Sequence, residues 1–290
     1  MPPELLLDGR AELGESPAWD AGNDCLYWVD IHAGLLHSFH SRNKTDTCVP
    51  LGEPVGCVAP CQNGDLITAL RSSFATFHPS THKLTRLVSP ELNRPGNRFN
   101  DGKCDPAGRF IAGSMDDAEK EASGGLYSYS ADGRLMTLLT GVRISNGLTW
   151  SPDYKTFYYI DTPSGEVKAY GYDLSRGELD HPRRVINVPR ELGWPDGMTS
   201  DLEGMLWVAM WGGARLTRWN PATGELLEAI PFPALNITSC IFGGENLSDL
   251  YVTSARQGMA EGQLKKYPLS GGLFKVKTKV QGLPTFKFGG

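Results

Sequence analysis

The sequence predicts an all-β fold, a six-bladed β-propeller with four antiparallel strands in each blade. The stretch NGLTWSPDYKTFYYIDT at residues 146–162 shows the basic pattern. An amide residue and a Gly open an apolar run, Ser-Pro-Asp makes a turn, and an aromatic strand follows, as in a β-hairpin. The same hairpin recurs five more times at spacings of 41 to 50 residues, which is the period of propeller blades. The unbroken repeat predicts one domain over residues 1–290.

The segment at residues 4–13 is strand-like, but no complete blade precedes it. We expect it to pair with the outer edge of the last blade, because closing the ring in this way hides two strand edges. In the repeats, a second and less hydrophobic strand pair follows the hairpin and breaks at turns such as Ala-Asp-Gly and Ala-Thr-Gly. The aromatic side chains of these outer pairs are predicted to pack between blades: Tyr127, Tyr129, Tyr170, Tyr172 and Trp219.

Two connections depart from the repeat. Residues 115–125, MDDAEKEASGG, are too polar to be buried, and they form either a lid over the channel mouth or an ordinary surface loop. Residues 190–197, RELGWPDG, place Trp194 and Pro195 directly before Asp196, in a position to supply an aromatic wall.

Composition argues against several classes of function. A net charge of -5 without a Lys/Arg cluster argues against a nucleic-acid partner. No run of apolar residues approaches the ~18 that a membrane helix needs, so no membrane partner is expected. The start MPPELLLDGR lacks a basic segment before its short apolar run, so we expect a cytoplasmic protein, and a monomer or weak oligomer. The cysteines are expected to be buried free thiols: Cys25, Cys48, Cys57, Cys61, Cys104 and Cys240.

The innermost strands of a propeller run in the same direction along the channel, so the residues that open them meet at one mouth. In chain order these residues are Glu15, Gly56, Asn100, Asn146, Asp196 and Thr238. Two carboxylates and two amides therefore converge. Asp and Asn also favour the turns that precede strands, which is an ordinary explanation for any one of them, but Glu15 has no such preference.

Glu15, Asn146 and Asp196 offer carboxylate and amide oxygens without sulfur or imidazole. Such donors suit a hard divalent cation such as Ca²⁺, Mg²⁺ or Mn²⁺, with Zn²⁺ and Fe²⁺ as further candidates for a single bound metal. In a six-blade ring the first and fourth blades face each other and the fifth adjoins the fourth, so these three side chains can meet near the axis. Three protein ligands leave positions open for water or substrate, as a Lewis-acid metal requires.

Arg98 lies two residues before Asn100 and carries only hydrogen-bond donors, so it cannot bind a metal. Its planar guanidinium is suited to bind a carboxylate or several hydroxyls of a substrate above the metal. A salt bridge to Asp101 or to the carboxylates of residues 115–125 is the alternative. The predicted substrate-binding residues are Arg98, Asn100 and Asp101.

Five ordered motifs resemble the gluconolactonase/regucalcin family, also called the senescence marker protein-30 family. They are LGESPAWD at 13–20, NRFNDGKCDPAGRF at 97–110, SNGLTWSPD at 145–153, WPDGMTSDLEGMLWVAMWGG at 194–213 and TSCIFGG at 238–244. Members of this family are six-bladed propellers that hydrolyse sugar lactones with a divalent metal. The resemblance covers essentially the whole chain.

The resemblance implies metal ligands at Glu15, Asn146 and Asp196, and sugar-hydroxyl contacts from Arg98 and Asn100. One position departs from the family pattern. Where members related to regucalcin have a substrate-contacting Glu, the ungapped alignment places Ala118 here, with three acidic residues nearby: Asp116, Asp117 and Glu119. That contact, and the sugar preference that depends on it, are left open.

The activity implied by the resemblance is hydrolysis of an aldonolactone, such as glucono-, xylono-, galactono- or arabinono-lactone, to the aldonic acid. The metal would bind the lactone oxygens and stabilise the oxyanion formed when water attacks the carbonyl. Asp196 is the predicted catalytic group for proton transfer, and water with a metal-lowered pKa is the alternative base. Two other functions stay open, namely a non-catalytic calcium-binding regulatory protein and a phosphotriesterase-type hydrolase on the same metal site.

Overall fold

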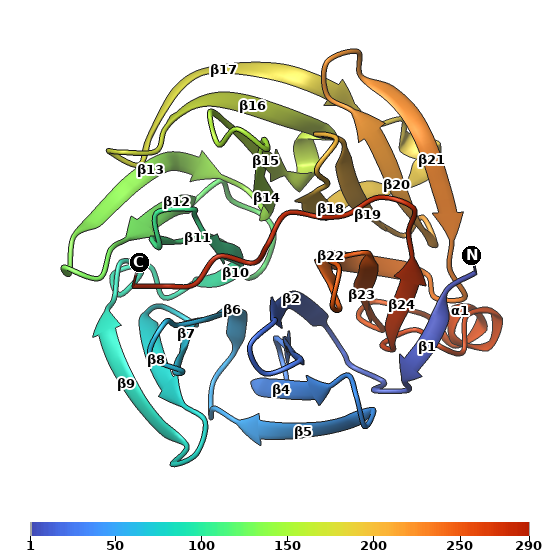
Figure 1. Ribbon diagram of the computed structural model, residues 1–290, viewed down its shortest axis with the longest axis horizontal. Coiled ribbons are helices and arrows are strands. Elements are labelled where there is room, and N and C mark those ends of the chain that lie inside the picture. The colour runs from blue at the N-terminus through green and yellow to red at the C-terminus, as the bar shows by residue number, and fades with distance from the viewer. Residues whose placement is uncertain (1, 290) are drawn as a thin grey trace.

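The computed structural model describes residues 2–289. Six four-stranded antiparallel sheets are arranged as blades in a ring around a central channel, as Figure 1 shows. The predicted all-β, six-bladed propeller is therefore confirmed. Within the described residues no helix is both long and apolar enough to cross a membrane.

Each of blades 1 to 5 uses four consecutive strands, ordered from the channel outwards. The innermost strands are β2 (Gly14–Asp20), β6 (Val55–Pro60), β10 (Asn97–Cys104), β14 (Ser145–Trp150) and β18 (Trp194–Ser200). The second strands are β3 (Cys25–Asp30), β7 (Leu66–Leu70), β11 (Phe110–Asp116), β15 (Thr156–Asp161) and β19 (Leu206–Trp211). The third strands are β4 (Leu35–His40), β8 (Phe74–His78), β12 (Gly124–Tyr129), β16 (Glu166–Asp173) and β20 (Arg215–Asn220). The outermost strands are β5 (Thr45–Pro50), β9 (Lys83–Val88), β13 (Leu135–Val142), β17 (Glu178–Asn187) and β21 (Glu225–Pro231).

Blade 6 combines the two ends of the chain. Its first three strands are β22 (Asn236–Gly243), β23 (Asp249–Ala255) and β24 (Leu273–Lys277), and its outermost strand is the N-terminal β1 (Glu4–Leu7). β1 pairs antiparallel with β24, which confirms that the N-terminal segment closes the ring. A short helix, α1 (Glu261–Lys266), lies in the connection between β23 and β24 and was not predicted from the sequence.

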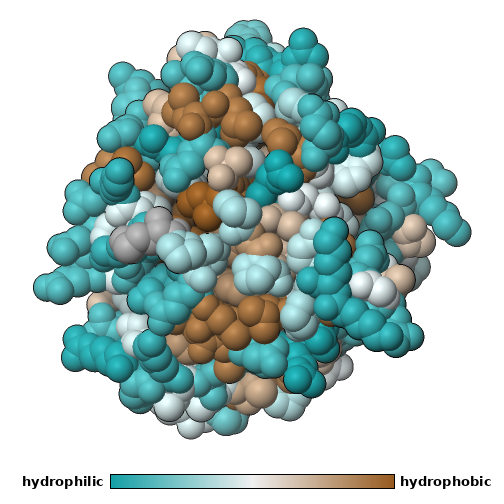
Figure 2. Space-filling view, turned by 90° about the vertical axis from the view of Figure 1, so that its right-hand side faces the viewer, coloured by the Kyte–Doolittle hydropathy of each residue, from teal (hydrophilic) through white to brown (hydrophobic). Residues whose placement is uncertain are grey.

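The side of the molecule on which β1 closes the ring is mostly hydrophilic, with a few hydrophobic patches between the polar side chains (Figure 2). Large apolar side chains that stay exposed include Leu5 on β1 and Leu226 and Leu227 on β21. Because both strands are outermost, one face of each lacks a covering blade. Single exposed apolar residues of this kind are normal for a folded protein.

The hydrophobic core lies between neighbouring blades. Every residue of the innermost strand β14 is buried, because other blades cover both of its faces, whereas the outermost β5 is largely exposed. The aromatic residues predicted to pack between blades do so: Tyr127 and Tyr129 between blades 2 and 3, Tyr170 and Tyr172 between blades 3 and 4, and Trp219 between blades 4 and 5.

The C-terminal segment, residues 280–289, runs across the ring at the end where the inner hairpins turn (Figure 1, red). The backbone carbonyls of Phe288 and Gln281 accept hydrogen bonds of 3.0 and 2.8 Å from Gln62 and Leu202, which lie in the inner hairpin turns of blades 2 and 5. The ring of Phe286 packs edge-on against Trp150, with 6.4 Å between centroids. This segment therefore covers one end of the channel, which the sequence analysis did not anticipate.

The cysteines are free, as expected, but not all of them are buried. Cys48 is exposed, because it lies on β5, the outermost strand of blade 1. The expectation of a uniformly buried set was therefore wrong at this position.

Candidate functional site

Each innermost strand shifts register at its predicted ring position or directly after it. The pairing of the first strand with the second shifts register between Glu15 and Ala18, Val55 and Cys57, Phe99 and Gly102, Asn146 and Leu148, Pro195 and Met198, and Ile237 and Ser239. A bulge takes a residue out of the regular ladder and redirects its side chain. Four ring residues lie inside the shift, namely Gly56, Asn100, Asp196 and Thr238, whereas Glu15 and Asn146 are the last paired residues before it.

The ring opens on a cavity of about 480 Å³, a size typical of small-molecule sites. Five predicted residues line it: Glu15, Arg98, Asn100, Asn146 and Asp196. Further side chains in its wall are Leu13, Met115, Glu119, Arg143, Ile144, Thr162, Pro163, Arg190, Trp194, Trp211 and Gln257. The structure therefore brings the predicted metal ligands and two of the three predicted substrate-binding residues to one cavity.

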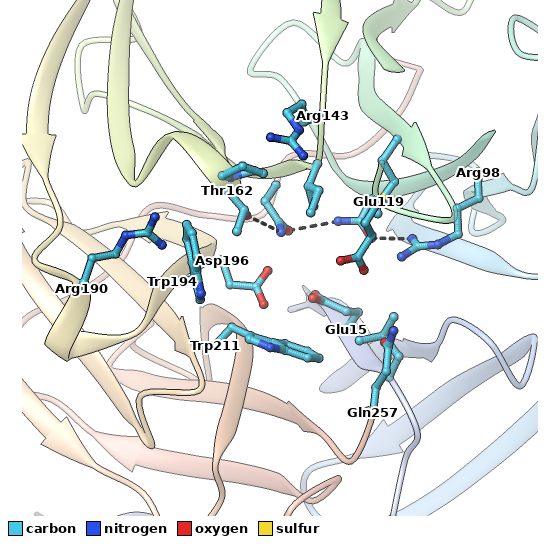
Figure 3. A pocket seen from close by; sticks show the side chains of 16 residues that line it. Glu15, Arg98, Glu119, Arg143, Thr162, Arg190, Trp194, Asp196, Trp211 and Gln257 are labelled. Atoms are coloured by element: carbon cyan, nitrogen blue, oxygen red, sulfur yellow. Dashed lines mark hydrogen bonds between the residues drawn. The ribbon is translucent and has the colours of Figure 1, made fainter. Parts of the chain in front are cut away.

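Glu15 and Asp196 are both buried, and Figure 3 shows their carboxylates directed towards the same region of the cavity. Burial raises the pKa of Glu15 to about 8, and the negative charge of Asp101 adds to this effect. Burial, followed by the charge of Glu15, raises the pKa of Asp196 well above its usual value. The protein alone therefore does not balance the charge of these carboxylates, and each favours either a proton or a cation.

The backbone next to Glu15 helps to hold its side chain. Ser16 adopts a positive φ of 49°, which is uncommon for a residue other than Gly. Its N–H donates a 3.0 Å hydrogen bond to a carboxylate oxygen of Glu15, and its hydroxyl accepts a 3.2 Å hydrogen bond from the N–H of Val58 in blade 2. The orientation of Glu15 is thus tied to the neighbouring blade.

Asp101 lies off the cavity wall. It is buried, and one of its carboxylate oxygens accepts a 2.8 Å hydrogen bond from the N–H of Gly102. Nearby, Lys103 donates a hydrogen bond to the carbonyl of Met198, and burial lowers its pKa while the charge of Asp101 raises it. Of the predicted substrate-binding residues, Asp101 is therefore the one that the structure does not bring to the cavity.

A chain of hydrogen bonds joins blades 3, 4 and 5 at the cavity (Figure 3). Nδ2 of Asn100 donates to Oδ1 of Asn146 at 3.2 Å, and Nδ2 of Asn146 donates to the hydroxyl of Thr162 at 2.9 Å. The Thr162 hydroxyl in turn donates to the carbonyl of Pro195 at 2.8 Å, next to Asp196. This network assigns the amide orientations and leaves the oxygen of Asn146, rather than its nitrogen, for a cation.

Arg98 is buried and held on two sides. Its Nη1 donates to Oδ1 of Asn100 at 2.6 Å, and its Nε donates to a carboxylate oxygen of Asp117 at 2.9 Å. The other oxygen of Asp117 accepts a 3.0 Å hydrogen bond from Arg71. The salt bridge to residues 115–125 is therefore present, and the same guanidinium also lines the cavity.

Residues 115–125 span the end of β11, a compact turn built around Asp116, and the start of β12. The backbone N–H groups of Lys120 and Glu121 donate to one carboxylate oxygen of Asp116 at 2.9 and 3.1 Å. Within this turn Glu119 has a φ of 59°, and its side chain extends into the cavity (Figure 3). The acidic side chain that this connection supplies to the cavity is thus Glu119, one residue after Ala118.

An aromatic wall is present on the side of blade 5. Trp194 and Trp211 both line the cavity, as the sequence suggested for Trp194. The guanidinium carbon of Arg190 lies 3.4 Å from the ring centroid of Trp194. Arg190 begins the short 3₁₀ helix η2 (Arg190–Leu192), directly before the inner strand of this blade.

Several cavity residues were not predicted from the sequence, although the topology of the hairpins places some of them at the cavity. In an antiparallel hairpin the second strand ends where the first begins. Trp211 ends β19 and Thr162 directly follows β15, so both emerge at the same mouth as the ring residues. Arg143, Arg190 and Gln257 lie in connections, for which the repeat offered no comparable signal.

The donor set fits a hard divalent cation. Oδ1 of Asp196 is buried without a hydrogen-bond partner, next to a second carboxylate that repels it. Two carboxylates and one amide oxygen are the ligand chemistry that such cations prefer. Within residues 2–289 no group of three or more His, Cys, Asp or Glu side chains is arranged to hold a metal, and the predicted set contains only two such residues.

Residues 13–256 match the family model described as the SMP-30/gluconolactonase/LRE-like region. The chain belongs to this family. It is 39% identical to regucalcin of Macaca fascicularis over 293 residues, covering 99% of this chain and 98% of that protein. It is 38% identical to the putative sugar lactone lactonase YvrE of Bacillus subtilis (strain 168) over 288 residues, again covering 99% of this chain and 98% of the relative.

A solved structure described as the calcium-binding protein regucalcin from Agrobacterium tumefaciens strain C58 superposes with a TM-score of 0.95. It is 26% identical and covers 99% of this chain and 97% of its own. The resemblance found in the sequence motifs is therefore confirmed. Membership of the SMP-30/gluconolactonase/LRE-like family supports a sugar lactone lactonase activity in general terms.

Proposed function

We propose that this SMP-30/gluconolactonase/LRE-like protein is a metal-dependent lactonase that hydrolyses a sugar lactone, such as glucono-, xylono-, galactono- or arabinono-lactone, to the aldonic acid. The observation that carries the proposal is the pair of buried carboxylates, Glu15 and Asp196, facing a cavity of about 480 Å³. The oxygen of Asn146 completes the ligand set. A bound divalent cation would stabilise developing negative charge on the lactone oxygens and lower the pKa of the attacking water.

The protein's own residues supply a base for the attacking water and a route for the proton to the leaving oxygen. Asp196 is the proposed catalytic group: a carboxylate oxygen that the metal leaves free would accept the proton of the attacking water, and water with a metal-lowered pKa is the alternative base. Water adds to the carbonyl carbon, the ring C–O bond breaks, and the ring oxygen leaves as a hydroxyl after taking up a proton. Hydrolysis thus consumes one water and gives one aldonic acid.

Arg98 and Asn100 orient the sugar hydroxyls. Nε and Nη1 of Arg98 are engaged by Asp117 and Asn100, which fixes the plane of the guanidinium and leaves Nη2 for substrate. A donor held in place in this way binds without losing much side-chain freedom. The indole rings of Trp194 and Trp211 add an apolar wall that limits the access of bulk water.

A lactone panel tests the proposal. Acid release from glucono-, xylono-, galactono- and arabinono-lactone is followed in excess chelator and then with Mg²⁺, Mn²⁺, Fe²⁺, Zn²⁺ or Ca²⁺ added back. We expect hydrolysis only with metal. Asp196→Ala should lower kcat/KM by about 10³-fold or more and weaken metal binding, since it removes both a ligand and the proposed base. Turnover by this variant at the wild-type rate would refute the assignment.

A calcium-binding regulatory protein without catalysis is the second candidate, and the pair of buried carboxylates and the description of the Agrobacterium relative favour it. Calorimetric Ca²⁺ binding without hydrolysis of any lactone in the panel would support this function. Hydrolysis of a phosphotriester but of no lactone would instead indicate a phosphotriesterase on the same site. Either result would replace the lactonase proposal.

A further inference from the structure

Two arginines line the cavity without an acidic partner. Arg143 lies just before β14 and Arg190 begins η2, and both belong to the cavity wall. Within residues 2–289 neither guanidinium comes within 4.0 Å of a carboxylate, whereas Arg98 pairs with Asp117 at 2.9 Å. Their positive charge is therefore available to a ligand.

Asp161, which contacts the backbone of Arg143, is already used by backbone N–H groups. The two carboxylate oxygens of Asp161 accept hydrogen bonds of 3.2 and 2.9 Å from the N–H groups of Arg143 and Ile144. These bonds hold the chain as it enters β14. The guanidinium of Arg143 is left exposed at the mouth of the cavity (Figure 3).

Arg190 is held in place by an aromatic ring instead of a carboxylate. Its guanidinium carbon lies 3.4 Å above the ring centroid of Trp194, whose side chain also lines the cavity. Stacking restrains the guanidinium but leaves the N–H groups at its edge free to donate. A stacked arginine of this kind suits the paired hydrogen bonds that a carboxylate or phosphate accepts.

The charges of the cavity are divided between two sides. The charged cavity residues of blade 3, Arg98 and Glu119, have opposite signs, and Arg98 is also paired with Asp117. Arg143 and Arg190 come from the segments that enter the inner strands of blades 4 and 5, and Figure 3 shows them on either side of Thr162. With a divalent cation compensating Glu15 and Asp196, the side of blades 4 and 5 is the positive one.

We propose that the preferred substrate is a sugar lactone with a second, negatively charged group at the end of the molecule away from the reacting carbonyl. Arg143 and Arg190 bind this group, which is a carboxylate or a phosphate. The hydroxyls of the lactone lie towards Arg98 and Asn100, and the carbonyl lies at Glu15 and Asp196. This proposal rests on the proposed lactonase function and specifies its substrate class.

The test compares three lactones that differ in their terminal group: gluconolactone, glucarolactone and 6-phosphogluconolactone. With saturating metal, we expect kcat/KM for at least one anionic lactone to exceed that for gluconolactone by about tenfold or more, since each charge-assisted hydrogen bond is worth about a factor of ten. The preference should shrink as salt is raised, because the arginines are partly exposed. The carboxylate and phosphate arms show which anion is recognised.

Variants connect the preference to the two arginines. Arg143→Gln and Arg190→Gln should each lower the ratio of anionic to neutral kcat/KM by about tenfold, mainly through KM, and Arg190→Lys should restore part of it. Arg134→Gln is the matched control, since Arg134 is exposed in the turn between β12 and β13, away from the cavity. Thermal unfolding verifies that each variant is folded.

A binding measurement separates this proposal from the proposed function. Calorimetry compares gluconate with glucarate on the metal-loaded protein, and we expect glucarate to bind about tenfold more tightly. If gluconolactone is hydrolysed but the anionic lactones have no advantage, and the arginine variants leave the ratio unchanged, the anion site is wrong and the lactonase stands. If no lactone is hydrolysed, the lactonase proposal fails. In that case equal binding of gluconate and glucarate would overturn the anion site as well.

Discussion

At the scale of single residues, the site contains buried charged side chains, of which some have a partner of opposite charge and others do not. Asp117 balances Arg98, while Glu15 and Asp196 face each other without a basic partner at hydrogen-bond distance among residues 2–289. The presence or absence of a charged partner indicates two different roles, substrate binding for Arg98 and cation binding for Glu15 and Asp196. A compensated arginine is held rigid for binding a substrate, and uncompensated carboxylates are suited to bind a cation.

The role of Arg98 predicts a change in binding more than in turnover. Arg98→Ala should raise KM for a sugar lactone by about tenfold or more and lower kcat by less, because it removes donors to hydroxyls away from the reacting carbonyl. Steady-state kinetics give the two values. Asp117→Asn is the control for loss of the salt bridge alone, and an equal loss of kcat with an unchanged KM in Arg98→Ala would contradict the role.

The raised pKa of Glu15 predicts how stability depends on pH. Burial raises this pKa from 4.5 to about 8, so the metal-free folded protein keeps a proton that the unfolded chain releases above about pH 4.5. The contribution of Glu15 to stability is therefore fully present below about pH 4.5 and is lost as pH rises through about 8. A divalent cation binds the deprotonated carboxylate, so its stabilising effect should increase with pH.

Urea unfolding at several pH values, with chelator and with metal, measures this dependence. In chelator the free energy of unfolding of the wild type should fall from about pH 5 to about pH 8. Glu15→Gln stays neutral throughout and should show a shallower fall. Parallel curves for the two proteins would exclude Glu15 as the titrating group.

At the scale of elements, the inner strands position the site through bulges and through the close approach of neighbouring blades. Gly147 directly follows Asn146 in β14, at the bulge of blade 4. A Cβ at this position would lie 2.6 Å from the carbonyl oxygen of Asp196 in blade 5. The absence of a side chain therefore allows the strands that carry two of the proposed metal ligands to come together.

Gly147→Ala should separate these two strands. We expect a loss of about 1–3 kcal/mol in stability from overpacking, together with weaker metal binding and lower kcat/KM. Chemical unfolding and metal titration give both values. Gly262→Ala is the matched control, since a Cβ there meets nothing within 4 Å and the residue lies in α1, where Ala is the better helix former. Wild-type metal affinity in Gly147→Ala would contradict the proposed spacing.

At the scale of the whole molecule, the ring is closed by a strand from the other end of the chain. In β1, Glu4 pairs with Lys275 and Leu5 with Phe274 of β24, and Lys44 of blade 1 donates a 2.8 Å hydrogen bond to Glu4. The cavity depends on this closure, because the proposed metal ligands that line it come from blades 1, 4 and 5. Closure of the ring by β1 therefore fixes the distances between blades 1, 4 and 5.

Removing β1 should therefore weaken the entire ring. Deletion of residues 1–8 exposes the edge of β24, and we expect a lower Tm, by about 5 °C or more, and concentration-dependent association through that edge. Differential scanning calorimetry and light scattering measure these effects. Deletion of residues 1–3, which leaves β1 intact, is the control, and an unchanged Tm in the longer deletion would show that closure does not need β1.

The sequence by itself determined the blades and the identity of the ring residues. Turn residues and alternating strands are local signals, so the repeat around residues 146–162 could be recognised without knowing any contact. Its spacing gave the number of blades, and the repeat alignment placed Glu15, Asn146 and Asp196 in one column. The shared direction of the inner strands was then enough to predict that these residues meet.

The tertiary structure decided which groups face the cavity and how they are held. Asp101 and Asn100 are neighbours in the chain, yet only Asn100 lines the cavity, while Asp101 is buried and accepts a hydrogen bond from the N–H of Gly102. The stacking of Arg190 on Trp194 and the placement of Glu119 likewise depend on loop conformations with no repeat to guide them. These loop conformations have no counterpart in the other blades, and their side chains share one cavity with Glu15 of blade 1 only because the closed ring brings the blades together.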